Sequence, residues 1–300
     1  MRGILYLIRM KIYDYLIIGN GIAGVTAAET IRENDSSGTI AIVSNEPYVL
    51  YSRVLLPSYL KNWIPRDKVF LRNIRDYSLR KIDLYVNKTV QFLDTARKEV
   101  GGEGGFLYGY KKLLIASGGR AREWESGNEE NIYRLQTLDD ADRVFRSLSR
   151  VKKPLVVGAS FISLEFLEIL LFNKTPPKLI VRDTHFFSRM LDRSGAELLH
   201  QNFARKGIVA EYGNEVTGIG YENGTLQIKR KTPEGIGADA VFLGIGITRN
   251  LEFLQGSQIL LGDNGIATDQ FLETNIKGVF ASGDVAEYFD VIAEKQRTVG

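Results

Sequence analysis

The stretch that decides the fold is YDYLIIGNGIAGVTAAE, residues 13–29. A short run of apolar and β-branched residues ends at Gly19, and helix-forming residues follow Gly21. This order predicts a strand, a tight glycine turn and a helix. Residues 39–44, TIAIVS, have the pattern of a second buried strand and lead to Glu46. Together these features predict a βαβ unit whose first turn has the spacing G-x-G-x-x-G.

This glycine turn predicts a dinucleotide site, because each glycine answers a different steric need. Gly19 makes the turn, Gly21 leaves room for a pyrophosphate to approach the backbone, and Gly24 lets the helix pack closely on the strand. Ile22 and Ala23 stand at the helix N-terminus, where backbone amides and the positive end of the helix dipole favour an anion. The acid that ends the unit is in the position where a carboxylate binds ribose hydroxyls.

The composition narrows the chemistry that the chain can perform. The sequence has 39 Lys and Arg against 36 Asp and Glu, a formal charge of +3, so we expect no nucleic-acid partner. The absence of cysteine excludes thiol nucleophiles, disulfide exchange and thiolate metal sites, so a cofactor must carry any redox step. The two histidines, His185 and His200, lack the spacing of metal ligands, and we expect no metal site.

The sequence also bears on where the chain works. It has no run of about 18 apolar residues, so we expect no membrane span. The apolar run at residues 4–8 is too short for a secretory signal and leads into charged residues, which favours a cytoplasmic location. Residues 10–15 lead directly into the first strand, so we expect Met10 to be the natural start and the nine preceding residues to be an upstream addition.

A second unit of the same kind begins near the middle of the chain. The stretch PLVVGASFISLE, residues 154–165, predicts a strand, a turn at Gly158 and a helix that begins at Phe161, and residues 178–181 predict the return strand. Two such starts predict an α/β protein with two Rossmann-like domains. Ser160 and Ser163 replace the second and third glycines, so we expect a hydroxyl at the close-approach position and a helix pushed away from its strand.

The residues after the return strand leave the second nucleotide open. Arg182 suits a 2′-phosphate and favours NADPH, whereas Asp183 suits the ribose of NADH. A site that binds neither nucleotide is the third alternative.

Four motifs together carry a resemblance to a known family. They are GNGIAG at residues 19–24, EPYVLYSRVLLP at residues 46–57, IASGG at residues 115–119 and ASGDVAE at residues 281–287. In their order and spacing the chain resembles the FAD-dependent pyridine nucleotide-disulfide oxidoreductases. It is most similar to the branch of rubredoxin reductase, ferredoxin reductase and the flavin part of nitrite reductase, although it lacks the redox cysteines.

The resemblance implies roles for individual residues. The first glycine turn would hold the FAD pyrophosphate, Glu46 the adenosine ribose and Asp284 the ribityl chain. The remaining implied contacts with FAD are Arg53 near the flavin, and Ala116, Ser117, Gly118 and Gly283 along the groove. The implied contacts with the nicotinamide nucleotide are Gly158, Ser160, Phe161, Glu165 and Arg182.

The resemblance also implies a domain organisation and an activity. Residues 1–119 and 241–300 would form an FAD-binding domain and residues 120–240 an inserted NAD(P)-binding domain, both of three-layer ββα type. The activity would be FAD-dependent NAD(P)H oxidation, with electrons passed to a redox protein, a quinone or dioxygen; no catalytic residue is assigned. The alternative is an FAD-binding companion subunit of a hetero-complex that does not use NAD(P)H. Relatives usually continue into a β-rich domain. We expect its absence to leave the flavin edge partly exposed, unless a partner subunit or a natural continuation of the chain covers it.

Overall fold

The computed structural model describes residues 10–124, 130–222, 225–231, 236–290, 292 and 295–298. The chain divides into two compact units. The terminal unit contains Met1–Ser52, Phe70–Arg120 and Arg249–Gly300, and the inserted unit contains Arg53–Val69 and Ala121–Thr248. The expectation that Met10 is the natural start concerns residues 1–9, which lie outside the described residues.

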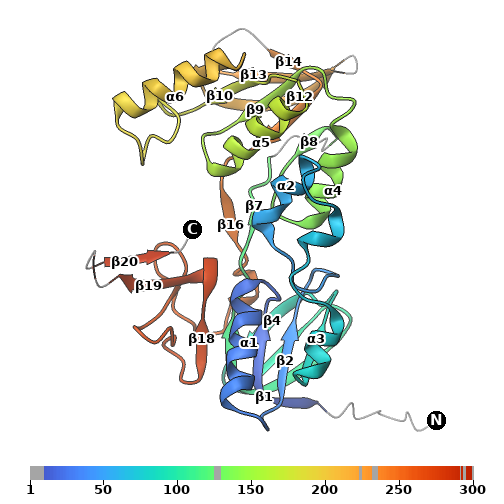
Figure 1. Cartoon of the computed structure of the whole chain (residues 1–300). Helices are drawn as coiled ribbons and strands as arrows, with labels where there is room; N and C mark the ends of the chain where they lie inside the picture. The colour runs from blue at the N-terminus through green and yellow to red at the C-terminus, as the bar shows by residue number, and fades with distance from the viewer. Residues whose placement is uncertain are drawn as a thin grey trace, which may run out of the picture. The chain divides into compact units, whose positions relative to one another are not determined.

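The terminal unit is built around one large sheet (Figure 1). Its elements are β1 (Lys11–Ile18), α1 (Ile22–Asn34), β2 (Ile40–Val43), α3 (Ile74–Leu79), β3 (Ile82–Tyr85), β4 (Val90–Asp94), β5 (Glu99–Gly102), β6 (Leu107–Ile115), β17 (Ile266–Ala267), β18 (Val279–Ala281), β19 (Ala286–Asp290) and β20 (Lys295–Thr298). The strand order is β3-β2-β1-β6-β5-β4, and β18 pairs with β6. β3, β2, β1, β6 and β18 are parallel, and β4 and β5 form antiparallel pairs.

The register of this sheet brings four loops to one edge. Ile18, the last residue of β1, pairs with Val43 at the end of β2 and with Ile115 at the end of β6. Ala281 at the end of β18 pairs with Ile115 as well. Because these parallel strands end together, the loops that follow them meet at the carboxyl edge of the sheet, where α/β proteins bind ligands.

Helix α1 covers one face of this sheet. Its Val25 and Ala28 are buried against Ile17 and its neighbours on β1 and β2. On the other face, Leu16 packs in a second buried cluster that includes Phe253. Successive side chains of a strand point to opposite faces, so adjacent residues of β1 serve both clusters.

The inserted unit contains a second parallel sheet. Its elements are α2 (Leu56–Leu60), β8 (Ile132–Tyr133), α4 (Leu138–Ser147), β9 (Pro154–Val157), α5 (Phe161–Phe172), β10 (Lys178–Val181), α6 (Arg193–Arg205), β11 (Val209–Tyr212), β12 (Val216–Glu222), β13 (Thr225–Arg230), β14 (Ile236–Ala238) and β15 (Ala240–Leu243). The parallel strands have the order β11-β10-β9-β15-β8, and β12-β13-β14 form a separate antiparallel sheet. The short strands β7 (Gly119–Ala121) and β16 (Ile247–Arg249) lie where the chain passes between the units.

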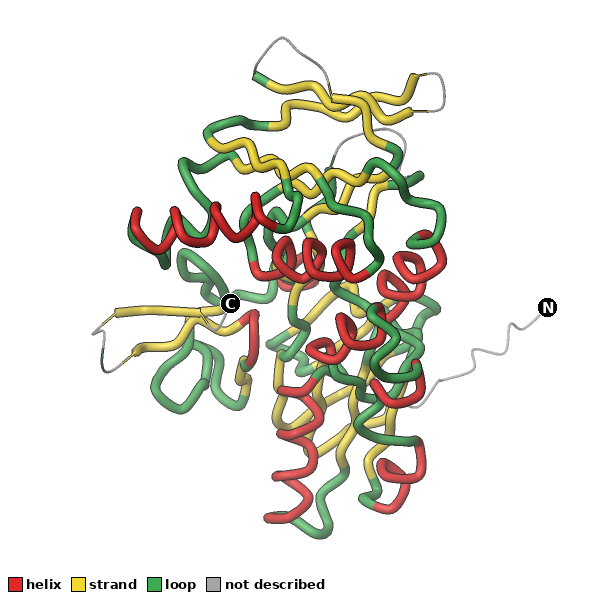
Figure 2. Tube along the Cα trace, turned by 45° about the horizontal axis from the view of Figure 1, so that its top comes forward, coloured by secondary structure: helices red, strands yellow, loops and turns green. Residues whose placement is uncertain are grey.

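This unit has the three-layer ββα arrangement that the resemblance implies. Val241 is buried in a cluster with Ile228 of the antiparallel sheet. The next residue, Phe242, points the other way and contacts Phe166 of α5, with ring centroids 5.0 Å apart. The two strand layers lie on one side of the helices (Figure 2). The predicted α/β class with two Rossmann-like domains is therefore confirmed.

Two segments lie in a different unit from the one that the sequence predicts, and Arg120 belongs to the terminal unit instead of the inserted one. Residues 53–69 and 241–248 belong to the inserted unit. For the second segment the reason is β15, which pairs with both β9 and β8. For the first it is α2: the ring of Tyr59 stacks on Phe145 at 5.0 Å, and its hydroxyl donates to Asp142. That the terminal unit binds FAD and the inserted unit NAD(P) stays a prediction.

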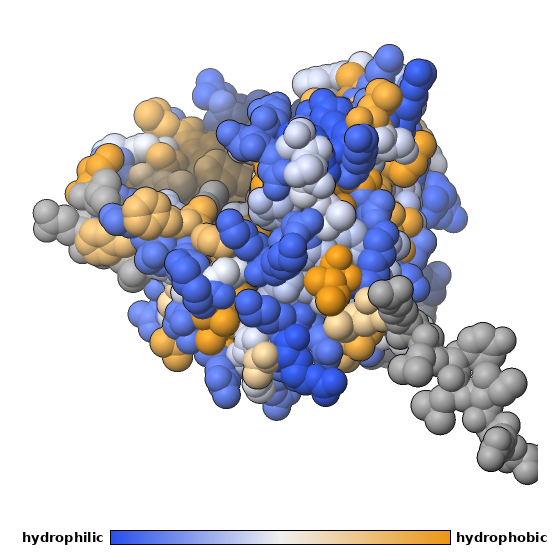
Figure 3. Space-filling view, turned by 90° about the horizontal axis from the view of Figure 1, so that it is seen from below, coloured by the Kyte–Doolittle hydropathy of each residue, from blue (hydrophilic) through white to orange (hydrophobic). Residues whose placement is uncertain are grey.

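The surface combines charged and scattered apolar side chains. On the face seen in Figure 3, hydrophobic residues gather in small groups between hydrophilic ones. Trp63 and Val54 are among the large apolar side chains that are exposed. None of the helices in the described part of the chain combines the length and the apolar character that a membrane crossing requires.

Candidate functional site

The first glycine turn lies where β1 and β6 end. Gly19 has a φ of +112°, which L side chains rarely adopt, and a Cβ at this position would lie 2.1 Å from the carbonyl oxygen of Ala116. The amide of Gly19 donates to the carbonyl of Val43 at 2.8 Å. Only glycine allows the chain to turn this close to both neighbouring strands.

The first turn of α1 is open toward the carboxyl edge of the sheet. Gly21 is the N-cap, no side chain accepts from the helix amides there, and a Cβ on Gly21 would meet no atom within 4 Å. A Cβ on Gly24, by contrast, would lie 2.0 Å from the carbonyl oxygen of Gly19. The helix therefore packs tightly on its strand while its first amides and the space beside Gly21 stay accessible to an anion.

The late motif ASGD reaches the same helix end. The amide of Ser282 donates to the carbonyl of Ile115 at 3.0 Å, which extends the β6–β18 pairing. Gly283 follows with a φ of +74°, and a Cβ there would lie 3.2 Å from the Cβ of Ala23. The hydroxyl oxygen of Ser282 is buried and has no hydrogen-bond partner among the described residues. Residues from both ends of the sequence thus form one cradle with an unsatisfied hydroxyl.

Asp284 follows this contact in a short 3-10 turn, Gly283–Val285. Its backbone carbonyl accepts from Nε of Arg249 at 2.8 Å. In the part of the chain that the structure describes, its partly buried carboxylate forms neither a hydrogen bond nor an ion pair. The arginine therefore holds the backbone of the turn and does not pair with the carboxylate.

Glu46 lies in a loop that is tied to the glycine turn. The carboxylate accepts from the hydroxyl of Tyr51 at 2.6 Å. Asn20, inside the glycine turn, donates to the carbonyl of Tyr48 at 3.0 Å and accepts from the hydroxyl of Tyr77 at 2.9 Å. This buried amide links the two motifs, so the acid and the glycine turn keep a fixed relation.

The segment Ala116–Gly118 has a partner that the sequence does not reveal. Ser117 donates through Oγ to the carbonyl of Asn250 at 2.8 Å, and Nδ2 of Asn250 donates back to the carbonyl of Ser117 at 2.9 Å. The amide of Asn250 also donates to the carbonyl of Gly118 at 3.0 Å. Asn250 and Arg249 thus brace the two sides of the cradle, and no local pattern in the sequence distinguishes them from ordinary loop residues.

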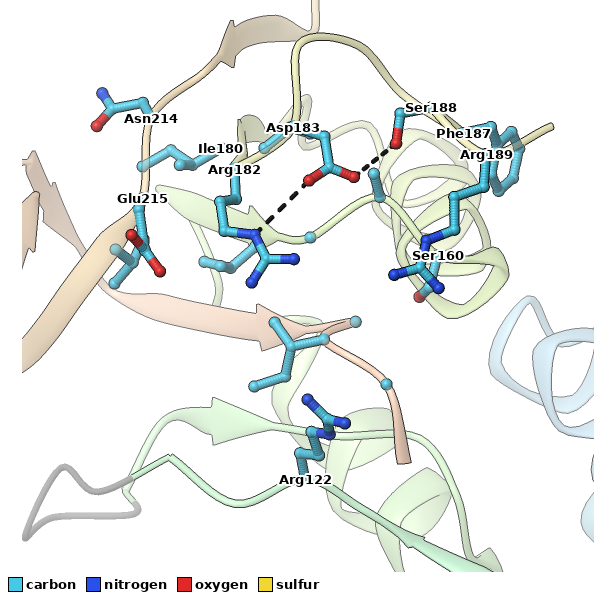
Figure 4. A pocket seen from close by; sticks show the side chains of 18 of the residues that line it. Arg122, Ser160, Ile180, Arg182, Asp183, Phe187, Ser188, Arg189, Asn214 and Glu215 are labelled. Carbon is cyan, nitrogen blue, oxygen red and sulfur yellow. Dashed lines mark hydrogen bonds and ion pairs between the residues drawn. The ribbon is translucent and has the colours of Figure 1, made fainter. Parts of the chain in front are cut away.

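The inserted unit contains a pocket of 530 Å³ at the carboxyl ends of β9, β10 and β15 (Figure 4). Its lining includes Gly158 and Ser160 of the second glycine turn, and Arg182 and Asp183 after β10. A Cβ on Gly158 would lie 2.3 Å from the carbonyl oxygen of Gly244, so this turn repeats the tight crossing of the first one. The sequence-predicted residues Gly158, Ser160 and Arg182 therefore meet in one cavity.

The second helix caps itself, unlike α1. Oγ of Ser160 accepts from the amide of Ser163 at 3.2 Å, and Oγ of Ser163 accepts from the amide of Ser160 at 3.4 Å, a capping box. The expected push of Ser163 against the strand is wrong. Ser163 is fully buried and donates to the carbonyl of Gly244 at 3.2 Å. A Cβ on Gly244 would lie 2.0 Å from this hydroxyl, so glycine at 244 supplies the room that glycine at 163 would have given.

Glu165, Phe161 and Arg53 have separate environments within the inserted unit. Burial raises the pKa of the Glu165 carboxyl, and repulsion by Glu168 raises it further. Phe161 is 64% exposed, and its ring lies 4.9 Å from that of Phe187. The guanidinium of Arg53 donates to the carbonyl of Gln136. The structure therefore leaves the predicted cofactor roles of these three residues untested.

The relation to known proteins agrees with this geometry. The model of the pyridine nucleotide-disulphide oxidoreductase family matches residues 13–298. The chain belongs to this family. Because the match includes all four motifs, the resemblance predicted from the sequence is confirmed.

Individual relatives cover much of this chain. It is 29% identical over 279 residues to apoptosis-inducing factor 3 of Mus musculus, covering 92% of this chain but 46% of that protein. It is 25% identical over 280 residues to NADH-rubredoxin oxidoreductase of Clostridium acetobutylicum, covering 93% of this chain and 70% of that protein. Among solved structures, the covalent putidaredoxin reductase-putidaredoxin complex aligns with a TM-score of 0.90 at 22% identity, covering 96% of this chain and 71% of that chain. The chain thus spans less than half of the mouse relative.

Proposed function

We propose that the protein is an FAD-dependent NAD(P)H oxidoreductase that passes electrons to an external acceptor. The observation that carries this proposal is the cradle in the terminal unit. It combines a helix N-terminus without a side-chain cap, open space where a Cβ on Gly21 would lie, and two polar groups, the buried Ser282 hydroxyl and the Asp284 carboxylate, that have no partner among the described residues. Such a set of donors, acceptor and free space suits a dinucleotide with a pyrophosphate and several hydroxyls.

The proposed contacts follow the chemistry of each group. Gly19, Gly21, Ile22, Ala23 and Gly24 would present backbone amides and space to the FAD pyrophosphate. Glu46 would accept from the adenosine ribose and Asp284 from the ribityl hydroxyls, because a carboxylate is a pure acceptor. The further proposed FAD contacts are Arg53, Ala116, Ser117, Gly118 and Gly283.

The proposed role of the protein is to align the nicotinamide nucleotide with FAD. When bound, FAD supplies the capacity to take a hydride from a nicotinamide nucleotide and to deliver electrons onward. The inserted unit would hold that nucleotide through Gly158, Ser160, Phe161, Glu165 and Arg182. The acceptor is proposed to be a small redox protein, supported by the relative named for rubredoxin; a quinone or dioxygen are the alternatives. A cytoplasmic location remains part of the proposal, and fractionation of cells with an antibody to the chain tests it.

One observation favours a second candidate function. Because Ser160 satisfies the third amide of α5 with its own side chain, the second helix offers fewer free donors to a pyrophosphate than α1 does. The second candidate is therefore an FAD-binding companion subunit that does not use NAD(P)H.

Anaerobic mixing of the purified holoprotein with NADH and with NADPH separates the two functions. We expect at least one of the two nucleotides to bleach the flavin absorption band rapidly. A flavin that only dithionite reduces would favour the companion subunit, and a purified protein without flavin absorption would contradict both functions.

A further inference from the structure

The pocket of the inserted unit has an excess of arginine side chains. Arg122, Arg182 and Arg189 line it, and all three are exposed. The guanidinium groups of Arg122 and Arg182 point toward one another across the pocket (Figure 4). The acids of the lining are Asp183 and Glu215, and the latter pairs with Lys231 at 2.8 Å, outside the lining. Arginine charges therefore outnumber acid charges in the lining, and the cavity favours an anionic ligand.

The carboxylate of Asp183 contacts two side chains of the inserted unit. Its Oδ2 accepts from Oγ of Ser188 at 2.6 Å, and its Oδ1 lies 3.6 Å from Nε of Arg182. The hydrogen bond from Ser188 holds the pKa of this carboxyl below its usual value, and the charges of Arg182 and Arg189 act in the same direction. One oxygen thus accepts a hydrogen bond from Ser188 and the other lies at ion-pair distance from Arg182, so the carboxylate is placed to orient the Arg182 guanidinium.

Arg182 occupies the position that selects between the two nicotinamide nucleotides. It directly follows β10, the second strand of the βαβ unit, where an acid binds the ribose 2′-hydroxyl and an arginine accommodates a 2′-phosphate. Its side chain is 70% exposed, and only Nε is near Asp183, so the far end of the fork is directed to solvent and pocket. A planar guanidinium with several parallel donors suits a phosphate better than a hydroxyl.

We propose that the inserted unit selects NADPH over NADH, with Arg182 binding the 2′-phosphate and Asp183 acting as its positioning residue. This inference rests on the proposed function and narrows its nucleotide. It also settles the choice that the sequence leaves between Arg182 and Asp183, because the two side chains form one arrangement rather than two competing sites.

Binding of adenosine 2′,5′-bisphosphate and of adenosine 5′-monophosphate to the holoprotein tests the proposal by titration calorimetry. We expect the bisphosphate to bind at least tenfold more tightly. Arg182→Ala should weaken the bisphosphate at least tenfold and the monophosphate less than twofold. Arg205→Ala is the matched control, because this exposed arginine lies in α6 outside the pocket lining and should change neither affinity.

Two further variants complete the test of Arg182 and Asp183. Arg182→Gln provides the same test if the alanine variant does not fold. Asp183→Asn should change the affinity for the monophosphate less than twofold, because its carboxylate is not the ribose acceptor. A tenfold loss of monophosphate affinity in Asp183→Asn would assign the ribose to Asp183 and overturn the proposal.

The remaining outcomes separate this inference from the proposed function. The intact protein could bind adenosine 2′,5′-bisphosphate and adenosine 5′-monophosphate equally tightly while NADH and NADPH bleach the flavin alike. This result would overturn the selection of NADPH but would agree with the proposed oxidoreductase function. If the protein binds neither the bisphosphate nor the monophosphate, and neither NADH nor NADPH bleaches the flavin, both the selection of NADPH and the oxidoreductase function are overturned.

Discussion

The two glycine turns of the molecule have the same backbone crossing and opposite helix starts. In the terminal unit, Gly19 lies against the backbone carbonyl of Ala116, and α1 begins after its N-cap Gly21 without a side-chain cap. In the inserted unit, Gly158 passes under the carbonyl of Gly244, and α5 begins at Ser160 with a complete capping box.

The difference shows that the free amides at a helix N-terminus have two uses in this fold: they can stay open to a ligand, or they can bind the helix's own capping side chain. An uncapped N-terminus leaves its donors for an anionic ligand, whereas a capped one gains stability from its own side chain. We therefore expect the terminal unit to bind its ligand through open space and backbone amides, and the inserted unit to bind its ligand through side chains such as Arg182. The predictions below test this contrast.

Gly19→Ala should give the largest effect. The added Cβ would lie 2.1 Å from a backbone carbonyl at a φ of +112°, so strain and overlap add. We expect the free energy of unfolding to fall by about 3 kcal/mol or more in urea titration. Gly105→Ala is the control: its φ is +72° but nothing lies within 4 Å, so it should cost only about 1–2 kcal/mol. Equal losses in the two variants would contradict the steric reading.

Gly244→Ala tests the corresponding contact in the inserted unit. Its Cβ would lie 2.0 Å from the hydroxyl of Ser163, so we expect a loss of about 2 kcal/mol in urea titration. Ser163→Ala removes that oxygen, and the double variant should recover at least about 0.5 kcal/mol relative to additivity. Recovery is partial because the backbone nitrogen of Ser163 would still lie 2.7 Å away. Strict additivity would show that the two residues do not share one space.

Gly21→Ser gives the terminal unit the helix start of the inserted one. The hydroxyl would cap α1 and occupy the open space, so the fold should gain a few tenths of a kcal/mol at most. The Kd of FAD should rise at least tenfold, measured by flavin fluorescence on the apoprotein. Unchanged flavin binding would show that the pyrophosphate does not approach Gly21.

Ser160→Gly makes the reverse exchange. It frees the amide of Ser163, so we expect the Kd of NADPH to fall severalfold, measured by titration calorimetry. The free energy of unfolding should fall by only a few tenths of a kcal/mol, whereas Ser160→Ala should cost about 1 kcal/mol. Tighter binding in neither variant would mean that the capping box does not compete with the nucleotide.

Glu165→Gln should have the smallest effect. Because burial raises the pKa of this carboxyl above its usual 4.5, the folded protein holds the proton more tightly than the unfolded chain. The charged form therefore destabilises the fold as pH rises through the raised pKa. We expect Gln to add about 0.2–0.5 kcal/mol at pH 7.5, the cost of a like-charge pair one turn apart, and nothing at pH 4.

Urea midpoints at the two pH values measure this effect. Glu168→Gln is the control, since it removes the same repulsion but also the 2.9 Å ion pair with the buried Lys61, and should destabilise. A gain at pH 4 as large as at pH 7.5 would contradict the titration of Glu165.

Much of the fold follows from local patterns. The helix predicted to begin at Phe161 does begin there as α5, and the glycine turn after β1 lies where its spacing predicts. The brace formed by Asn250 could not be predicted, because its hydrogen bonds to Ser117 join positions 133 residues apart. The placement of residues 53–69 in the inserted unit depends likewise on the stacking of Tyr59 against Phe145.

The sequence by itself determined where the helices and turns begin, because a glycine pattern and a run of apolar residues act on their immediate neighbours. Only the tertiary structure decided that Gly283 rests on Ala23 and that Gly244 makes room for Ser163. It also decided that Asp183 accepts from Ser188 and lies 3.6 Å from Nε of Arg182. These relations depend on which atoms close packing brings together, and a pattern along the chain does not contain that distance information.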